Sequence, residues 1–133
     1  MIVAVIDTHA VIWYLQNNPK LSAHADAFIS AAATAGDKIA VSSITLIETV
    51  YLIEKGRISA EVFSTIARIL RTPNGVFEEM PVDLEIARVL NRIEASKVPD
   101  MPDRIIAATS LYLNVPVISK DGKIQLSGLT TIW

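Results

Sequence analysis

The chain has 133 residues, of which 51% are hydrophobic and 20% charged, so we expect residues 1–133 to form one domain with a buried core rather than a disordered chain. A net charge of −2 excludes a generally basic nucleic-acid-binding surface, and the absence of cysteine excludes disulfides and thiolate metal sites. No stretch reaches the roughly 18 apolar residues that span a bilayer, and the first apolar run is too short for a signal peptide. We therefore expect a cytoplasmic protein without a membrane partner.

The first predicted element is a strand from Ile2 to Ile6, in which Val and Ile fill four of the five positions. An unbroken apolar run is typical of a strand covered on both faces, as in a parallel sheet between helices. Asp7 follows this strand directly. Open α/β sheets carry their chemistry just beyond the carboxyl ends of such strands, so Asp7 is the first candidate metal ligand.

The rest of the chain alternates between predicted helices and strands. Capping residues at helix starts, and glycine after helix ends, mark most of the boundaries. We expect helices at 8–16, 22–35, 42–55, 59–70, 83–95 and 100–113, and strands at 38–41, 76–82, 115–119 and 130–133. Pro81 makes the strand at 76–82 broken or an edge strand. This alternation predicts an α/β fold, a three-layer α/β/α domain with a mainly parallel central sheet of about four to five strands.

Asp121 follows a second apolar strand, just as Asp7 follows the first. If the two strands are parallel, both carboxylates lie at the same edge of the sheet. For either aspartate alone, a turn or a helix cap is the commoner role. Their matched positions on two strands favour a shared site.

Glu48 lies on the apolar side of its predicted helix, within one turn of Ile44 and Leu52. A carboxylate buried there without a partner would be costly, which makes Glu48 a candidate ligand. The alternative is an exposed glutamate at the edge of the apolar stripe. Glu54 and Glu61 are expected to be such ordinary surface acids.

Asp100 and Asp103 open the sixth predicted helix, with Pro102 between them. Capping by Asp100 and a favourable dipole interaction for Asp103 explain both residues without any ligand. The same geometry also points both side chains off the front of the helix, where a metal ion can be held.

If Asp7, Glu48, Asp103 and Asp121 converge, their mutual repulsion requires protons or a metal ion. Oxygen ligands without cysteine or a pair of histidines favour Mg²⁺ or Mn²⁺. Such ions bridge carboxylates to phosphate oxygens and lower the pKa of a bound water. We therefore expect metal-assisted phosphodiester hydrolysis with these four as catalytic residues and metal ligands, and Asp100 as a candidate fifth ligand.

Four motifs, in this order, resemble those of PIN-domain ribonucleases, and among them the VapC-type toxins of bacterial toxin–antitoxin pairs. The motifs are Asp7 to Trp13, Val41 to Glu48 continued by 54–58, Asp103 to Thr109, and Ser119 to Asp121. The resemblance extends over essentially the whole chain. One departure is Met101, which stands directly after Asp100 where these toxins commonly have proline.

The resemblance implies a PIN-like domain over residues 1–133, RNA as substrate, Mg²⁺ or Mn²⁺ as cofactor and products with a 5′-phosphate. It also implies a homodimer and inhibition by a small cognate antitoxin protein. Thr8, His9, Arg104 and Ser119 flank the proposed ligands and are candidate substrate-binding residues. For each of them a structural role stays open, which for Arg104 is a salt bridge with a site acid.

Several other side chains have weaker signals. A candidate RNA-binding strip, or an ordinary solvated face, is formed by Lys55, Arg57, Arg68 and Arg71. Core or dimer contacts, rather than base-stacking platforms, are expected for Trp13, Tyr14 and Tyr51.

Three other functions remain open. A phosphoacceptor domain also places an aspartate after its first strand, but the dehalogenase-like type needs a second carboxylate where this chain has His9. A non-catalytic interaction module would keep the PIN fold alone. A metal-free ribonuclease would need an acid–base pair, for which His9 and His24 are the available histidines.

Overall fold

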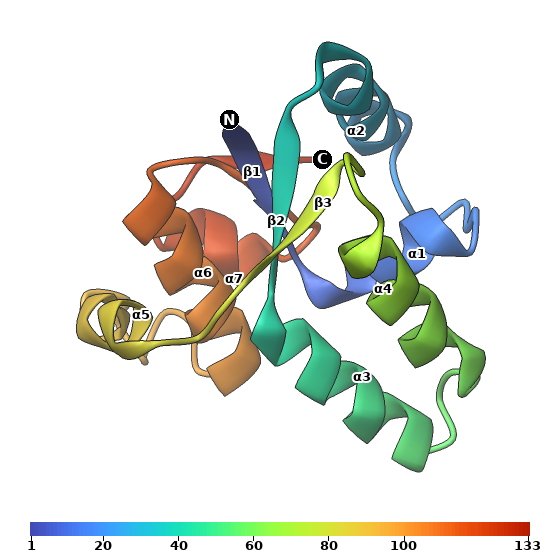
Figure 1. The fold of residues 1–133 in the computed structure, drawn as a ribbon. Coiled ribbons are helices and arrows are strands. Elements are labelled where there is room, and N and C mark those ends of the chain that lie inside the picture. Colours follow the sequence, from blue (N-terminus) through green and yellow to red (C-terminus); the bar gives the residue numbers. More distant parts are fainter.

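Five strands form one parallel sheet with β1 at its centre, as a computed structural model of residues 1–133 shows. The strands are β1 (Ile2–Ile6), β2 (Lys38–Ser42), β3 (Phe77–Met80), β4 (Val117–Ile118) and β5 (Thr131–Ile132) (Figure 1). Their order in the sheet is β3-β2-β1-β4-β5, and every pairing is parallel. The carboxyl ends of the strands therefore share one edge, and the predicted fold class is confirmed.

Helices cover both faces of the sheet, and side chains along each strand alternate between the two faces. In β1, Ala4 and Ile6 belong to one apolar core and Val5 to the other. The first core includes residues of α1 (Thr8–Leu15), α2 (Ala23–Ala35), α3 (Ser43–Glu54) and α4 (Glu61–Arg71). The second includes residues of α5 (Leu84–Leu90), α6 (Met101–Leu113) and α7 (Gly122–Leu126), so the sheet lies between two helical layers (Figure 1). Burial on both faces explains the unbroken apolar run of β1.

Local capping residues set several helix boundaries where the sequence predicts them. At the start of α2, Ser22 Oγ accepts a hydrogen bond from the Ala25 amide at 3.0 Å. Gly36 ends the same helix with a φ of 77°, in the left-handed region that glycine tolerates. Asp83 caps α5 as predicted, with its Oδ1 atom accepting two backbone amide bonds.

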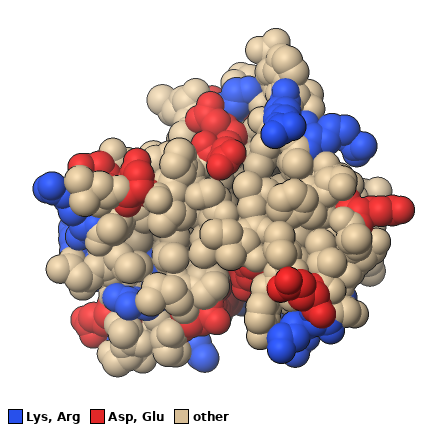
Figure 2. Space-filling view, turned by 60° about the horizontal axis from the view of Figure 1, so that its bottom comes forward, with Lys and Arg blue, Asp and Glu red and all other residues tan.

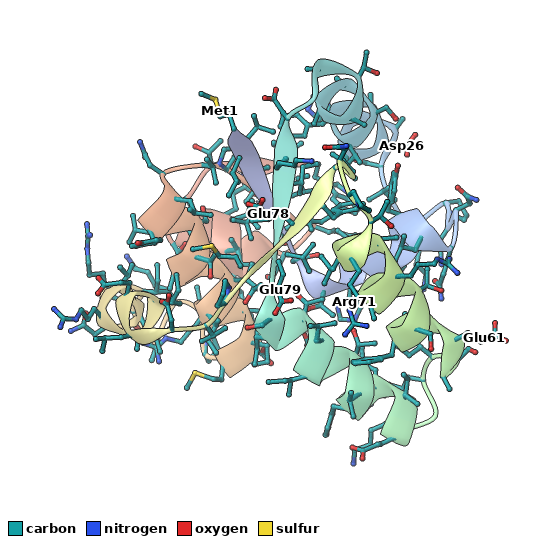
Figure 3. All side chains as sticks on the ribbon, viewed as in Figure 1. Met1, Asp26, Glu61, Arg71, Glu78 and Glu79 are labelled. Carbon is teal, nitrogen blue, oxygen red and sulfur yellow. The ribbon has the colours of Figure 1, made fainter.

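β3 lies at an edge of the sheet, which confirms the prediction that Pro81 makes this strand broken or an edge strand. Glu78 and Glu79 lie along it and are exposed (Figure 3). Charged side chains on an edge strand oppose pairing with a further strand. Extension of the sheet at this edge is therefore disfavoured.

Several elements are shorter than predicted: β3 covers Phe77–Met80 rather than 76–82, β5 covers Thr131–Ile132 rather than 130–133, and α5 and β4 are shortened because backbone groups bond elsewhere. α5 stops at Leu90 rather than near Ala95, since the Arg104 side chain donates hydrogen bonds to the carbonyl groups of Leu90 and Ile93. β4 covers Val117–Ile118 alone, because the amide of Val115 still bonds the end of α6.

One helix, α7, is not predicted at all. The Asp121-Gly122 pair is typical of a turn, but here Asp121 caps a helix of five residues. This helix contributes Ile124, which is fully buried in the second core. None of the seven helices combines the length and apolar character that a membrane span requires.

Candidate metal centre

Three helices begin near one another at the carboxyl edge of the sheet, and an aspartate caps each one. Asp7 follows β1 and caps α1, Asp121 follows β4 and caps α7, and Asp100 caps α6. In each case the Oδ1 atom accepts a backbone amide bond, at 2.8, 2.8 and 3.1 Å respectively. Capping and ligation are compatible, because a cap uses one carboxylate oxygen and the helix dipole favours the negative charge.

Five carboxylates from four chain segments line one cleft at this edge. The cleft has a volume of about 420 Å³, and its acidic residues are Asp7, Glu48, Asp100, Asp103 and Asp121. The strand register explains why Asp7 and Asp121 lie close together. Ile6 pairs with Ile118, and the amide of Asp7 donates to the Ile118 carbonyl at 3.1 Å.

Asp7 is 8% exposed, and this burial raises its pKa. Hydrogen bonds from the Ser119 hydroxyl and the Ala10 amide act in the opposite direction and favour the carboxylate. Ser119 is itself buried, and its Oγ accepts a bond from the Asp121 amide at 3.0 Å. Ser119 therefore joins two of the proposed ligands and holds them in position.

Asp103 carries a proton near neutral pH. Burial, the negative charge of Asp100, and a hydrogen bond and charge interaction with Asp121 raise the pKa of Asp103 to about 8, and the charge of Glu48 adds to this. Its proton supplies the hydrogen bond to Asp121. Protonation is thus how the metal-free cleft relieves the repulsion between its carboxylates.

Glu48 reaches the cleft from α3, the helix that follows β2. Its Oε1 atom is buried and has no hydrogen-bond partner. A buried acceptor without a partner is unfavourable by about 1–3 kcal/mol, and more when it is charged. Such an atom in a native fold calls for a ligand, which an ion in this cleft would supply.

The residues present fit a divalent cation, although no three of them lie at a spacing that already holds one. All five lining acids offer oxygen, which is the ligand type that Mg²⁺ and Mn²⁺ prefer. Glu48 has an unpartnered buried oxygen, and Asp103 holds a proton that a cation would displace.

Three predicted substrate-binding residues, Thr8, Arg104 and Ser119, lie outside the cleft lining. Ser119 acts through its hydrogen bonds to Asp7 and Asp121. The Oγ1 atom of Thr8 is 3.0 Å from that of Thr45 in the interior, where the pair connects α1 to α3. Arg104 donates its hydrogen bonds to the Leu90 and Ile93 carbonyls, so the expected salt bridge with a site acid is not formed. His9, in contrast, does line the cleft.

Two residues of the cleft, Trp13 and Lys120, are not among the predicted site residues. Trp13 was expected in the core or at a dimer contact, yet it is half-buried and faces the acids. Tyr14 next to it does belong to the core, with its ring centroid 5.5 Å from that of Phe77. The sequence does contain a signal for Trp13. It lies one helical turn after His9, on the helix that Asp7 caps, so the side chains of His9 and Trp13 are on the same face of that helix.

The four basic residues considered as an RNA-binding strip separate into two pairs. Arg68 and Arg71 line a groove of about 600 Å³ on α4. Arg57 precedes α4 and Arg71 ends it, so the two pairs lie at opposite ends of this helix (Figure 3 labels Arg71). Lys55 packs over the ring of Tyr51, with its ammonium 5.3 Å from the centroid.

The PIN-domain family model matches residues 4–126 of this chain. The chain belongs to the PIN-domain family. Solved structures with the same fold are components of toxin–antitoxin complexes. They include DNA-bound VapBC2 from Rickettsia felis (16% identity, TM-score 0.72) and DNA-bound VapBC from Salmonella typhimurium (19%, 0.72), each matched over 98% of this PIN domain and 97% of the other chain.

FitAcB from Neisseria gonorrhoeae is similar to this PIN domain as well (18% identity, TM-score 0.65), over 97% of this chain and 96% of that one. At these identities the likeness establishes the fold. Among curated proteins, no sequence matches the chain. The predicted resemblance to VapC-type PIN domains is thus confirmed at the level of family and fold.

Proposed function

We propose that this PIN domain is a metal-dependent endoribonuclease that acts as the toxin of a toxin–antitoxin pair. One observation carries the proposal: carboxylates from four separate segments of the chain line a single cleft at the carboxyl edge of the sheet. Repulsion among these acids makes their clustering unfavourable for a purely structural domain. A binding site for a cation accounts for it.

Asp7, Glu48, Asp103 and Asp121 would hold Mg²⁺ or Mn²⁺, with Asp100 as an additional ligand. The bound ion supplies Lewis acidity toward phosphate oxygens and a water of lowered pKa, which is the chemistry of phosphodiester hydrolysis to a 5′-phosphate. Ser119 keeps Asp7 and Asp121 at a fixed separation through its two hydrogen bonds. Lys120 at the cleft supplies a nitrogen donor for the substrate backbone, and His9 is a second substrate contact.

The toxin assignment is supported by the complexes in which the matching structures occur. VapBC and FitAcB pair the PIN fold with a partner, which favours a small cognate antitoxin for this chain also. The proposed substrate is RNA, and the proposed assembly is a homodimer.

An exposed apolar face on α3, with the Lys55 ammonium over its Tyr51 ring, supports the homodimer. Ile47, Val50 and Tyr51 lie on one side of this helix and are 65%, 41% and 55% exposed. Val82, also exposed, adjoins them because its amide donates to Ser43 Oγ at 3.0 Å. Figure 2, in which the α3 end of the molecule comes forward, shows a broad central area without charged side chains. Exposed apolar patches of this kind mark protein interfaces.

The function is tested by incubating the protein with total RNA in the presence and absence of Mg²⁺ and mapping the new ends by sequencing. We expect cleavage that requires the metal and leaves 5′-phosphates. Cleavage that persists in chelator and leaves cyclic phosphates would instead identify a metal-free ribonuclease. Intact RNA under all conditions would identify a non-catalytic module, and stable labelling of Asp7 by a small phosphodonor would identify a phosphoacceptor.

A further inference from the structure

Aromatic rings form a short row beside the acidic cleft. The ring centroids of His9 and Trp13 are 5.8 Å apart, and those of Trp13 and Trp133 are 5.9 Å apart. Lys20 adds a cation, with its ammonium 5.9 Å from the Trp13 centroid. His9 and Lys20 are exposed, whereas both tryptophans are half-buried. Trp133 thus supports one edge of the Trp13 ring.

Trp13 borders two hollows at once. One is the acidic cleft, and the other is a groove of about 370 Å³ between α1 and α2. Besides Trp13, the groove is lined by the Tyr14 ring, the amides Asn17 and Asn18, one acid, Asp26, and the apolar residues Pro19, Leu21 and Ala23. A ligand that extends out of the cleft in this direction must pass over the Trp13 ring.

The charges of the lining residues indicate which part of a nucleic acid the groove beside Trp13 can bind. Asp26 repels phosphate, and no arginine or lysine lines the groove. Aromatic faces and amides are instead the groups that bind nucleobases, by stacking and by hydrogen bonding. Lys20 lies next to the Trp13 ring, where a phosphate adjoining a stacked base would pass. The combination of an aromatic face and a neighbouring cation is typical of single-strand binding.

A purely structural role for Trp13 does not explain its position. Tyr14, the next residue on the same helix, fills the core against Phe77. Both residues line the groove, but Trp13 alone of the two also lines the acidic cleft.

We propose that Trp13, together with His9, stacks one nucleobase of the RNA next to the scissile phosphodiester and so selects single-stranded substrate. This inference rests on the proposed ribonuclease function. It assigns base recognition to the α1 side of the cleft, away from the arginines of α4.

The test uses an oligoribonucleotide that spans a cleavage site mapped with total RNA, together with versions that lack the base at one position each. We expect Trp13→Leu to raise KM by roughly 5- to 150-fold, the range for loss of stacking on one base, with a much smaller effect on kcat. Trp13→Phe should recover most of the loss because it keeps an aromatic face. At one abasic position, wild type and Trp13→Leu should have the same KM.

Binding is measured separately from cleavage by tryptophan fluorescence. The chain has two tryptophans, so Trp133→Phe leaves Trp13 as the reporter. Quenching by the intact oligonucleotide, and its loss with one abasic version, would support stacking. Tyr112→Leu is the matched control, because Tyr112 is an aromatic residue of α6 that is 44% exposed and lines neither hollow.

An unchanged KM in Trp13→Leu would overturn the inference, and so would a KM increase of equal size with every abasic version. In either case, cleavage by the wild-type protein would still support the ribonuclease function. Wild-type protein that neither cuts nor binds RNA would overturn both. If Trp13→Leu does not fold, Trp13→Phe and the abasic series on wild type still decide the matter, since absence of any position-specific loss would contradict stacking.

Discussion

At the level of single residues, the acids of the cleft have two tasks. Asp7, Asp100 and Asp121 each use Oδ1 to cap a helix, which leaves the other oxygen available to the cleft. Asparagine caps a helix about as well as aspartate, but it carries no charge. Substitution with asparagine therefore separates the two tasks.

Asp7→Asn should lower RNA cleavage by at least about 100-fold, which exceeds the usual effect of losing a group that merely supports a ligand. The fold should be retained, because the cap to Ala10 is kept and a buried charge is removed. Cleavage rates and thermal melting measure the two effects. Asp83→Asn alters an equivalent cap on α5, away from the cleft, and should leave cleavage unchanged. Equal losses in both variants would contradict the metal centre.

The raised pKa of Asp103 predicts a pH dependence of metal-free stability. The folded state holds a proton on Asp103 up to a pH of about 8, whereas the unfolded state loses it near the ordinary value of 3.8. The folded state therefore binds more protons in this window, and the free energy of unfolding falls as pH rises through it. Urea denaturation in chelator should show greater stability at about pH 5.5 than at about pH 8.

Asp103→Asn should reduce this pH dependence, because the amide does not titrate. Part of the slope should remain, since burial raises the pKa of Asp7 in the same direction. A wild-type domain that gains stability toward pH 8 would contradict the crowding of carboxylates in the cleft.

At the level of elements, Arg104 shows how one helix positions another. It extends from α6, and its Nε and Nη2 atoms donate three hydrogen bonds, at 2.9–3.2 Å, to the carbonyls of Leu90 and Ile93. A cation at the end of a helix also interacts favourably with its dipole. Arg104 therefore fixes α5 against the helix that carries Asp103, and it does so without entering the cleft.

Arg104→Met should lower the free energy of unfolding by about 1.5–3 kcal/mol, the usual value for hydrogen bonds to a charged group. Mg²⁺-dependent cleavage should persist under conditions in which the variant is folded. Arg88→Met is the control, because its 3.9 Å pair with Glu85 is exposed and should contribute less than about 1 kcal/mol. Urea denaturation measures the loss of unfolding free energy in each variant. Losses of similar size in Arg104→Met and Arg88→Met would refute the role given to Arg104.

Elements with local signals were predictable from sequence, and those ended by distant contacts were not. Ser22 and Gly36 set α2 from within its own sequence, and the apolar run of β1 indicated its burial. α5 ends early because of Arg104, which no local pattern reveals. At the site, strand ends and helix starts pointed to the four aspartates and an apolar helix face pointed to Glu48, but Trp13 required knowledge of which side of α1 faces the cleft.

At the level of the whole molecule, the exposed apolar face and Glu48 of the acidic cleft are on the same helix, α3, but Ile47, Val50 and Tyr51 do not line the cleft. Each copy in a dimer formed through this face would keep its own cleft accessible. The two surfaces are therefore expected to respond to different substitutions.

Ile47→Asp should convert the proposed dimer to a monomer, because it places a charge in the apolar face. Sedimentation velocity measures the change in mass. Leu126→Asp is the matched control, since Leu126 is 77% exposed on α7, and it should leave the mass unchanged. A wild-type monomer at micromolar concentration would refute the dimer, and a dimer that survives Ile47→Asp would assign it to another face.

The pairing of β1 with β4 also determines when the cleft comes into existence. The ribosome makes Asp7 before its neighbour in the sheet, the strand that precedes Asp121, which follows only after six further helices have been made. Until then one side of β1 has no partner and the acids are incomplete. For an enzyme proposed to cut RNA, this order of synthesis separates translation from activity, because the growing chain has no assembled site with which to attack the message and the ribosome that produce it.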